Sequence, residues 1–123
     1  MTELSETQIQ NKVLRWAKDY PYKGKRLADY LVHVPNGEKR SKRVAAGLKH
    51  SGVKKGYPDL VMDIALNGYH GLRIELKTET GGVVSPEQNE RLKMLNSEGY
   101  LAVVCKGFDE AIKTITDYMG SKS

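Results

Sequence analysis

Two carboxylates and a lysine are the residues in this sequence whose types and spacing suit chemistry on a phosphodiester. Glu75, Leu76 and Lys77 form a Glu-x-Lys pattern in an apolar segment, and Asp59 follows Pro58 earlier in the chain. Because side chains alternate between the faces of a β-strand, Glu75 and Lys77 share one face. Carboxylates bind Mg²⁺, which polarises a phosphoryl oxygen and helps to generate hydroxide, while an ammonium group positions that nucleophile or stabilises developing charge. A salt bridge along a surface strand is the alternative interpretation.

The register of a predicted hairpin decides whether Asp59 joins that face. Alternating apolar residues predict two strands connected by a turn at Asn67-Gly68. A two-residue loop that continued into the strands without a break would pair Leu60 with Glu75 and mix the two faces. An odd loop or a bulge instead pairs Leu60 with Ile74 and places Asp59 opposite Glu75. We expect this second register.

The segment after Lys77 has the features of a phosphate site. Gly81-Gly82 allows the backbone to approach a large anion closely, and a helix begins directly afterwards. Ser85 is its predicted N-cap, with Pro86 at the first helical position. Gln88 completes a capping box with Ser85, and from the first turn it can also reach toward the face of Glu75.

Apolar spacing and capping signals predict a mixed α/β sheet flanked by helices, in the order α-β-α-β-β-α-β-α. The expected elements around the hairpin are a helix after Ser5, strand Leu31–Val34, helix Lys42–His50, helix Ser85–Ser97, strand Tyr100–Cys105 and helix Phe108–Met119. Residues Tyr20 to Arg26 are expected to form a connection. The strand–helix–strand unit from Gly71 to Cys105 requires a parallel, right-handed crossover beside the antiparallel hairpin.

Two further carboxylates call for an interpretation. Glu6 precedes Ile9 by one helical turn, so we expect it on the inward stripe of the first helix, an unusual place for a carboxylate. Asp63 shares the face of Asp59 and is either a displaced metal ligand or a partner of Arg73. We favour the ion pair with Arg73.

The chain carries a local excess of positive charge. Its 123 residues include 20 Lys and Arg against 15 Asp and Glu, a net charge of +5. Residues 39–55 contain no acidic residue and seven basic ones: Lys39, Arg40, Lys42, Arg43, Lys49, Lys54 and Lys55. Such a stretch suits a polyanion, and a solvated basic helix is the alternative interpretation.

Length and composition exclude several classes of protein. With 39% hydrophobic and 28% charged residues, the chain is neither disordered nor a coiled coil. The single cysteine, Cys105, excludes an intramolecular disulfide framework and a multi-cysteine zinc site. No apolar run approaches the ~20 residues that cross a bilayer, and the polar N-terminus shows no secretory signal. We therefore expect one soluble, cytoplasmic domain without membrane contacts, acting in the host cytoplasm if a phage encodes it.

The ordered motifs resemble a known nuclease family. The segments are ETQIQ, HVPNGEKR, GVKKGYPDLV, LRIELK, SPEQNERL and GYLAVVCKGFDEAI, which together cover nearly the whole chain. In this order they resemble the virus-type replication-repair nuclease domain, VRR-NUC, of the PD-(D/E)XK superfamily. The resemblance implies a restriction-endonuclease-like fold and a single nuclease domain over residues 1–123.

The resemblance also implies roles for individual residues. Asp59 and Glu75 would hold Mg²⁺ or Mn²⁺, with the Leu76 carbonyl as a third ligand, and Lys77 would be the catalytic lysine. Two more catalytic positions, which match the first-helix acid and the glutamine that assists the lysine or the phosphate, are Glu6 and Gln88. The expected nucleic-acid contacts combine the Pro-Asn-Gly loop and the basic stretch: Asn36, Arg40, Lys42, Arg43, Lys54 and Lys55. Glu38 stands where another glycine is common in that loop.

These observations lead to one principal hypothesis and two alternatives. The principal hypothesis is a metal-dependent, structure-specific endodeoxyribonuclease that acts as a homodimer on branched DNA such as Holliday junctions. The first alternative is a nickase or nuclease on flap or duplex DNA. The second is a basic nucleic-acid-binding module whose carboxylates have only a structural role.

Overall fold

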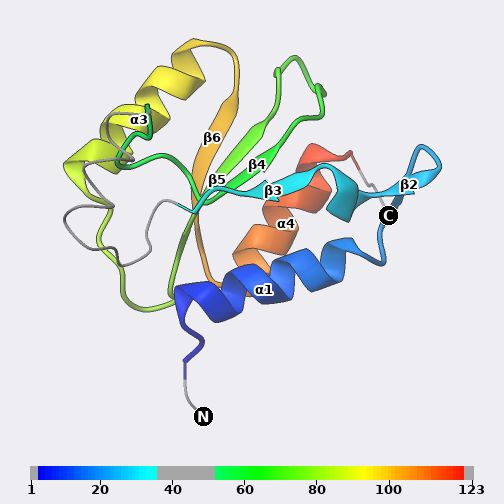
Figure 1. The fold of residues 1–123 in the computed structure, drawn as a ribbon, viewed down its shortest axis with the longest axis horizontal. Helices are drawn as coiled ribbons and strands as arrows, with labels where there is room; N and C mark the ends of the chain where they lie inside the picture. Colours follow the sequence, from blue (N-terminus) through cyan, green and yellow to red (C-terminus); the bar gives the residue numbers. More distant parts are fainter. Residues whose placement is uncertain (1–2, 36–51, 121–123) are drawn as a thin grey trace.

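The computed structural model describes residues 3–35 and 52–120, and the statements below concern these residues. Helix α1 (Glu6–Ala17) begins the fold (Figure 1). A capping box starts the helix, because the Ser5 hydroxyl accepts a hydrogen bond from the Gln8 N–H and the Gln8 side chain accepts one from the Ser5 N–H. These bonds satisfy two backbone donors that a helix start otherwise leaves unpaired.

A four-stranded mixed sheet forms the centre of the molecule. Its strands lie in the order β3 (Leu31–His33), β4 (Leu60–Met62), β5 (Leu72–Lys77) and β6 (Leu101–Lys106). Only the β5–β6 pair is parallel. Helix α3 (Pro86–Ser97) connects these two strands, and α4 (Phe108–Tyr118) follows β6. The arrangement confirms the expected mixed α/β sheet and is consistent with a restriction-endonuclease-like fold.

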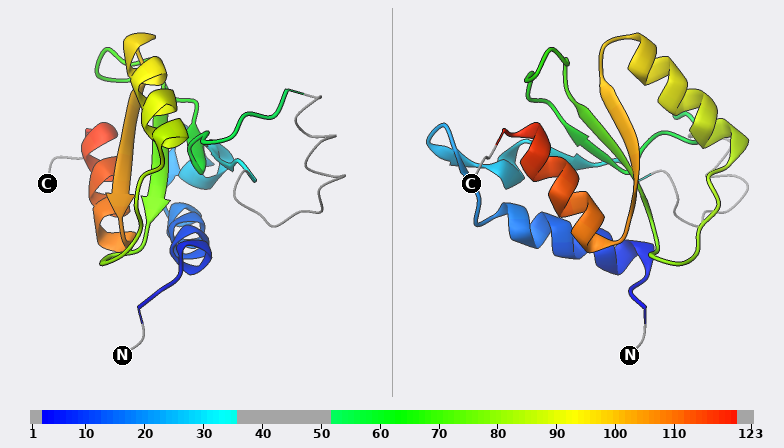
Figure 2. Two further views of the ribbon diagram at one scale, coloured as in Figure 1. Left: turned by 90° about the vertical axis from the view of Figure 1, so that its left-hand side faces the viewer. Right: turned by 180° about the vertical axis from the view of Figure 1, so that it is seen from behind.

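Helices cover both faces of the sheet (Figure 2). On one face, α1 and α4 pack against the apolar side of β5 in a core that includes Leu72, Ile74 and Leu76. On the other face, Leu92 and Leu95 of α3 form a smaller cluster with a side chain of β6. The alternation along β5 therefore turns one set of side chains into the main core and the other toward α3.

The register of the β4–β5 pair is the one expected from the sequence. Leu60 pairs with Ile74, and Met62 pairs with Leu72. Extending this pairing by one residue beyond the N-terminal end of β4 brings Asp59 to the level of Glu75. The two carboxylates therefore meet at the point where β4 begins.

The turn shows how a two-residue loop and this register coexist. Leu66 and Tyr69 form a bridge around Asn67-Gly68, whose φ angles of 55° and 84° are typical of the tight hairpin turn. Between this bridge and the strands, residues 63–65 lie opposite only residues 70–71. The one extra residue shifts the pairing and keeps the apolar side chains on one face.

One part of the expected fold was wrong and another lies outside the described residues. The expected connection from Tyr20 to Arg26 contains a small hairpin of β1 (Pro21–Tyr22) and β2 (Lys25–Arg26), followed by a short 3₁₀ helix, η1 (Leu27–Asp29). Its turn has positive φ angles at Lys23 and Gly24. Lysine rarely adopts a positive φ, so the residue types did not indicate a tight turn here. The expected helix at 42–50 lies outside the described residues. In the described ranges, no helix is long and apolar enough to cross a bilayer.

The close approach of Gly56 to α3 predicts a measurable cost of substitution. Gly56 has φ +85°, and a Cβ there would lie 2.7 Å from the Glu87 carbonyl carbon and 2.9 Å from the Gln88 nitrogen. Gly24 has a similar φ of +75° but open space around it. We expect Gly24→Ala to lower the free energy of unfolding by roughly 1–2 kcal/mol, from backbone strain alone. Gly56→Ala should cost about 1–3 kcal/mol more, because backbone must move.

Urea denaturation of both variants and the wild type measures this difference. Equal losses for the two variants would contradict the packing of Gly56 against the start of α3.

Candidate active site

The polar side of β5 carries three buried charged side chains, Arg73, Glu75 and Lys77, and the last two form the candidate site. Glu75 is 2% exposed and Lys77 is 6% exposed, on the face that α3 partly covers. The Lys77 Nζ lies 3.7 Å from the Glu75 Oε2. Burying a charge is costly unless an opposite charge or hydrogen bonds compensate it. The stability of the buried Glu75–Lys77 pair therefore depends on the hydrogen bonds and charges that surround it.

Asp59 reaches this face from the residue that precedes β4. Its Oδ2 accepts a hydrogen bond of 2.7 Å from the Leu76 N–H, and its own backbone carbonyl accepts one from Val34 at the end of β3. The N–H and carbonyl of one strand residue point to the same edge, so the Leu76 carbonyl is directed toward Asp59 as well. The neighbouring Lys77 carbonyl points the other way and accepts a hydrogen bond from Gly107. Two carboxylates and one carbonyl thus converge at this edge.

Gln88 connects α3 to the buried carboxylate. Its Nε2 donates a hydrogen bond of 2.9 Å to the Glu75 Oε2. The same side chain completes the capping box, with Oε1 accepting from the Ser85 N–H and the Gln88 N–H donating to the Ser85 hydroxyl. The structure therefore shows both contacts expected for Gln88. The start of α3 holds Glu75 in one orientation.

The environment of Glu75 favours its neutral form. Burial first, then the charge of Asp59 and a hydrogen bond with it, raise the pKa of Glu75 to about 8, although the charge of Lys77 acts in the opposite direction. The site therefore holds more negative than positive charge when its carboxylates are ionised. A bound cation would relieve this excess.

The donor set fits a hard divalent cation. The described residues contain no cluster of three or more His, Cys, Asp or Glu side chains that could hold a metal ion. Mg²⁺ does not need such a cluster, because it binds one or two carboxylates and keeps several waters. Asp59, Glu75 and the Leu76 carbonyl provide oxygen ligands of that kind. Their arrangement suits Mg²⁺ or Mn²⁺ and lacks the nitrogen and sulfur ligands typical of zinc.

Glu6 lies closer to solvent than expected. It is exposed, although Ile9, one turn later, is buried in the main core. The expectation of an inward carboxylate was wrong because the first residue of α1 extends past the core that Ile9 covers. The charge of Glu6 still contributes to the raised pKa of Glu75, as the smallest of the named causes. Glu6 therefore lies at the rim of the site rather than inside it.

Only part of the predicted nucleic-acid surface is described. Lys54 and Lys55 are exposed, and the Lys55 Nζ lies 4.0 Å from the Glu87 carboxylate at the start of α3. They precede Gly56, which packs against α3, so both lysines lie near the site. The other expected contacts fall outside the described residues: Asn36, Arg40, Lys42 and Arg43.

Two arginines also lie on this side of the sheet, Arg73 in β5 and Arg91 in α3. The Arg73 Nη2 lies 3.4 Å from the Asp63 Oδ1, as expected from the sequence, which gives Asp63 a partner other than a metal. Arg91 was missed by the sequence analysis. Its guanidinium lies 5.6 Å from the Tyr57 ring centre, and its Nε is buried without a hydrogen-bond partner among the described residues. Its position three residues after Gln88 places both on one helix face, a signal that could have identified it.

The raised pKa of Glu75 predicts how stability depends on pH in the metal-free protein. Between about pH 4.5 and pH 8, the folded chain keeps Glu75 protonated while the unfolded chain releases the proton. The stabilisation is therefore complete at low pH and is lost as pH rises through about 8. In EDTA, we expect the Tm of the wild type to fall by roughly 5 °C more than that of Glu75→Gln over this range.

Thermal melts of both proteins from pH 5 to pH 9 test this expectation. Glu98→Gln, which removes an exposed carboxylate at the end of α3, should follow the wild type. Asp59→Asn should move the loss to lower pH, because it removes the neighbouring charge. Parallel curves for the wild type and Glu75→Gln would contradict the assignment.

The chain is similar to a known family of domains. Residues 2–109 match the family model of the VRR-NUC domain. A search of curated proteins found no match. Among solved structures, a chain described as "VRR_NUC domain protein" is 44% identical and has a TM-score of 0.87. That alignment covers 97% of this chain and 91% of the other. The chain therefore belongs to the VRR-NUC family of nuclease domains.

Proposed function

We propose that this protein is a divalent-metal-dependent endodeoxyribonuclease that hydrolyses phosphodiester bonds in branched DNA, such as Holliday junctions. It acts in the cytoplasm as a homodimer of single VRR-NUC domains, each spanning residues 1–123. The observation that carries the proposal is the convergence of Asp59, Lys77 and Gln88 around the buried carboxyl group of Glu75. Membership of a nuclease family supports hydrolysis of a nucleic acid.

The proposed metal ligands are Asp59, Glu75 and the Leu76 carbonyl. A bound Mg²⁺ or Mn²⁺ supplies Lewis-acid polarisation of the phosphoryl oxygen and a more acidic water. The Leu76 N–H orients the Asp59 carboxylate, and the Gln88 amide orients Glu75. Both carboxylates are thus held in place before substrate arrives, which lowers the reorganisation needed during reaction.

Lys77 is the proposed catalytic lysine. Its ammonium group lies 3.7 Å from Glu75 and is nearly excluded from water. In such an environment a positive charge stabilises a developing negative charge more strongly than it does in water. Lys77 therefore positions the attacking water or stabilises the pentacovalent phosphate. Glu6, at the rim of the site, is the proposed assisting acid.

DNA binding is proposed to depend on phosphate contacts. The net charge of +5 supports a polyanionic partner. Lys54 and Lys55 lie beside the start of α3, and the buried Nε of Arg91 needs an acceptor that a phosphate oxygen would supply. We add to this surface the four expected contacts outside the described residues: Asn36, Arg40, Lys42 and Arg43. Phosphate contacts position DNA without reading its sequence.

Among DNA substrates, we propose a preference for branched DNA. Resolution of a four-way junction requires two cuts in equivalent strands, and one chain supplies one set of Asp59, Glu75 and Lys77. A two-fold dimer would present one set to each strand. The alternative, a nickase or nuclease on flap or duplex DNA, needs only the single site that each chain carries. A non-catalytic binding module would not explain why Glu75 and Lys77 are buried next to each other.

A cleavage assay with matched variants tests this proposal. End-labelled four-way junction, linear duplex and single-stranded DNA are incubated with Mg²⁺, Mn²⁺ or EDTA. We expect paired, symmetric cuts in the junction that require metal. Lys77→Met, which keeps the buried stem and removes the ammonium, should bind Mn²⁺ normally and lose cleavage by roughly 10²–10³-fold. Asp59→Ala should lose Mn²⁺ binding and cleavage together, and Lys113→Met, on an exposed face of α4, should retain both.

The pattern of substrates separates the alternatives. Cuts confined to duplex or single-stranded DNA would retain the site and reject the junction. Full activity of Lys77→Met would reject Lys77 as the catalytic lysine. Binding without cleavage under every condition would favour the non-catalytic module, and a monomer on the junction would reject the dimer.

The exposed lysines beside α3 predict the salt dependence of binding. Each neutralised phosphate adds about 0.9 to the slope of log K against log salt concentration. The double variant Lys54→Ala and Lys55→Ala should therefore bind DNA more weakly and reduce the magnitude of this slope by about 1–2. Fluorescence anisotropy between 50 and 200 mM salt, roughly the range over which this effect is large, measures the slope. An unchanged slope, equal to that of Lys113→Ala, would exclude both lysines from the interface.

A further inference from the structure

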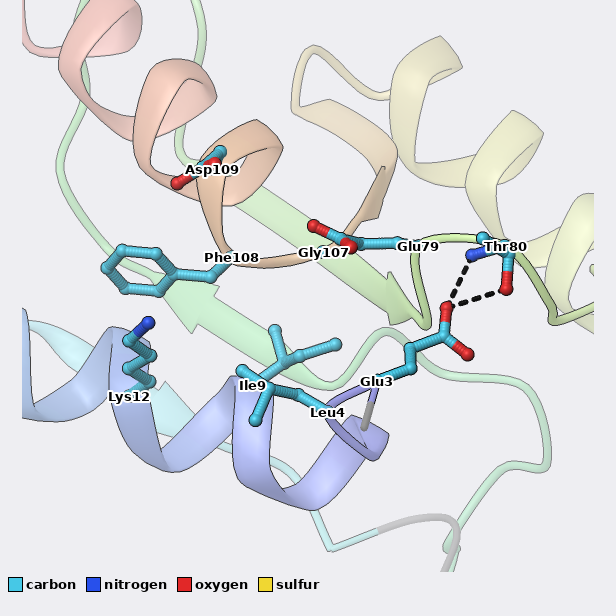
Figure 3. Close-up of a pocket in the computed structure, with 9 residues that line it drawn as sticks. All are labelled: Glu3, Leu4, Ile9, Lys12, Glu79, Thr80, Gly107, Phe108 and Asp109. Atoms are coloured by element: carbon cyan, nitrogen blue, oxygen red, sulfur yellow. Dashed lines mark hydrogen bonds between the residues drawn. The ribbon is translucent and has the colours of Figure 1, made fainter. Parts of the chain in front are cut away.

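An exposed glutamate ties the start of the chain to the segment that follows β5. The Glu3 Oε1 accepts a hydrogen bond of 2.7 Å from the Thr80 N–H and one of 2.8 Å from the Thr80 hydroxyl (Figure 3). Both bonds go to one carboxylate oxygen and hold the backbone as well as the side chain of Thr80. They connect the residues before α1 with the loop of residues 78–85, which we call the 78–85 loop.

The 78–85 loop forms one wall around Lys77. Gly82 has φ +84°, and a Cβ there would lie 3.0 Å from the Lys77 Cδ and 3.1 Å from its Cβ. The Gly82 backbone therefore packs directly on the stem of Lys77. This contact helps to explain why the Lys77 side chain is only 8% exposed at the end of a strand.

The other hydrogen bonds of the loop connect residues within the loop or at the start of α3. Near its start, the Thr78 hydroxyl accepts a hydrogen bond from the Gly81 N–H, and at its end Ser85 caps α3. The bonds from Glu3 reach the middle of the loop from a different element. Bonds to an ionised carboxylate are roughly twice as strong as neutral ones, and both Thr80 bonds lower the pKa of Glu3. Glu3 is therefore the contact from outside the loop that holds Thr80, two residues before Gly82.

We propose that Glu3 is a positioning residue for Lys77, acting through Thr80 and the backbone of Gly82. The inference rests on the proposed function, because it assigns Glu3 to the same site. The proposal also assigns a role to the segment before α1, because Glu3, which holds the 78–85 loop, lies three residues before Glu6. A change at Glu3 would loosen the wall around Lys77 without touching a metal ligand.

The position of Lys77 can be measured without any cleavage. Reductive methylation followed by peptide mass spectrometry gives the labelling rate of each lysine amine, with exposed Lys113 as the internal reference. Glu3→Ala should raise the rate at Lys77 about fivefold or more, because the loop opens more often. Glu3→Gln should stay closer to the wild type than Glu3→Ala does, since its amide oxygen accepts the same two bonds, each weaker without the charge. Thr80→Ala, which retains the backbone bond, should fall between them.

Glu79→Ala is the matched control for loss of charge. Glu79 precedes Thr80, but its side chain extends toward Gly107 and away from Glu3 (Figure 3). Its substitution removes a carboxylate from the same loop and leaves both Thr80 bonds in place. Labelling of Lys77 should therefore match that of the wild type.

Cleavage kinetics provide the second readout. Glu3→Ala should lower kcat by roughly ten- to a hundredfold, because a displaced catalytic group is costly, with KM unchanged. Glu3→Gln should restore most of the lost kcat. Equal labelling of Lys77 in the wild type and Glu3→Ala would overturn the proposal whether or not the protein cleaves DNA. Labelling of Lys77 in Glu3→Gln as fast as in Glu3→Ala would also overturn it, because the amide oxygen can still accept both Thr80 bonds. If the wild type cleaves no DNA, the proposed nuclease function fails, and the labelling rates still decide whether Glu3 positions Lys77.

Discussion

The burial of the Glu75 carboxyl group is the constraint on which the rest of the site depends. A carboxylate that is 2% exposed and adjacent to a second carboxylate is unfavourable unless protons, cations or hydrogen-bond donors compensate it. Lys77 and Gln88 provide part of that compensation from two elements, and a raised pKa accounts for the rest. An arrangement of this kind weakens a fold, so its presence points to use of the charges in binding or catalysis.

The two carboxylates meet because of a shift of one residue in the β4–β5 hairpin. A two-residue turn alone would bring Leu60 opposite Glu75 and turn apolar side chains toward water. The extra residue in 63–65 corrects the pairing, so that the main core and the polar site are consequences of the same register. A change that removed this residue would alter both at once. The chemistry of the site is therefore coupled to the stability of the sheet.

Local rules predicted the elements of this site well. Ser85 and Gln88 identified the start of α3 because capping depends on adjacent residues, and alternation placed Glu75 on the polar face. The rules failed where the outcome depended on residues far apart in the sequence. Helical spacing predicted the direction of the Glu6 side chain. It could not show that the core reaches along α1 only as far as Ile9 and leaves Glu6 in solvent. The contact between Glu3 and Thr80 joins residues 77 positions apart and has no local signature, so only the folded structure could reveal it.

The balance of charge explains why a cation suits both chemistry and substrate approach. Asp59 and Glu75, with Glu6 at the rim, bring three carboxylates toward the site. Among the described residues, Lys77 supplies the ammonium group in contact with Glu75, and a phosphate would add more negative charge. A phosphate is therefore repelled unless positive charge is added or a proton is retained. At a pH below about 8, Glu75 retains a proton in the absence of metal, so protons and a divalent cation compete for the same oxygen atoms. In the proposed function, metal binding would replace that proton with a charge that also attracts a nucleic-acid phosphate.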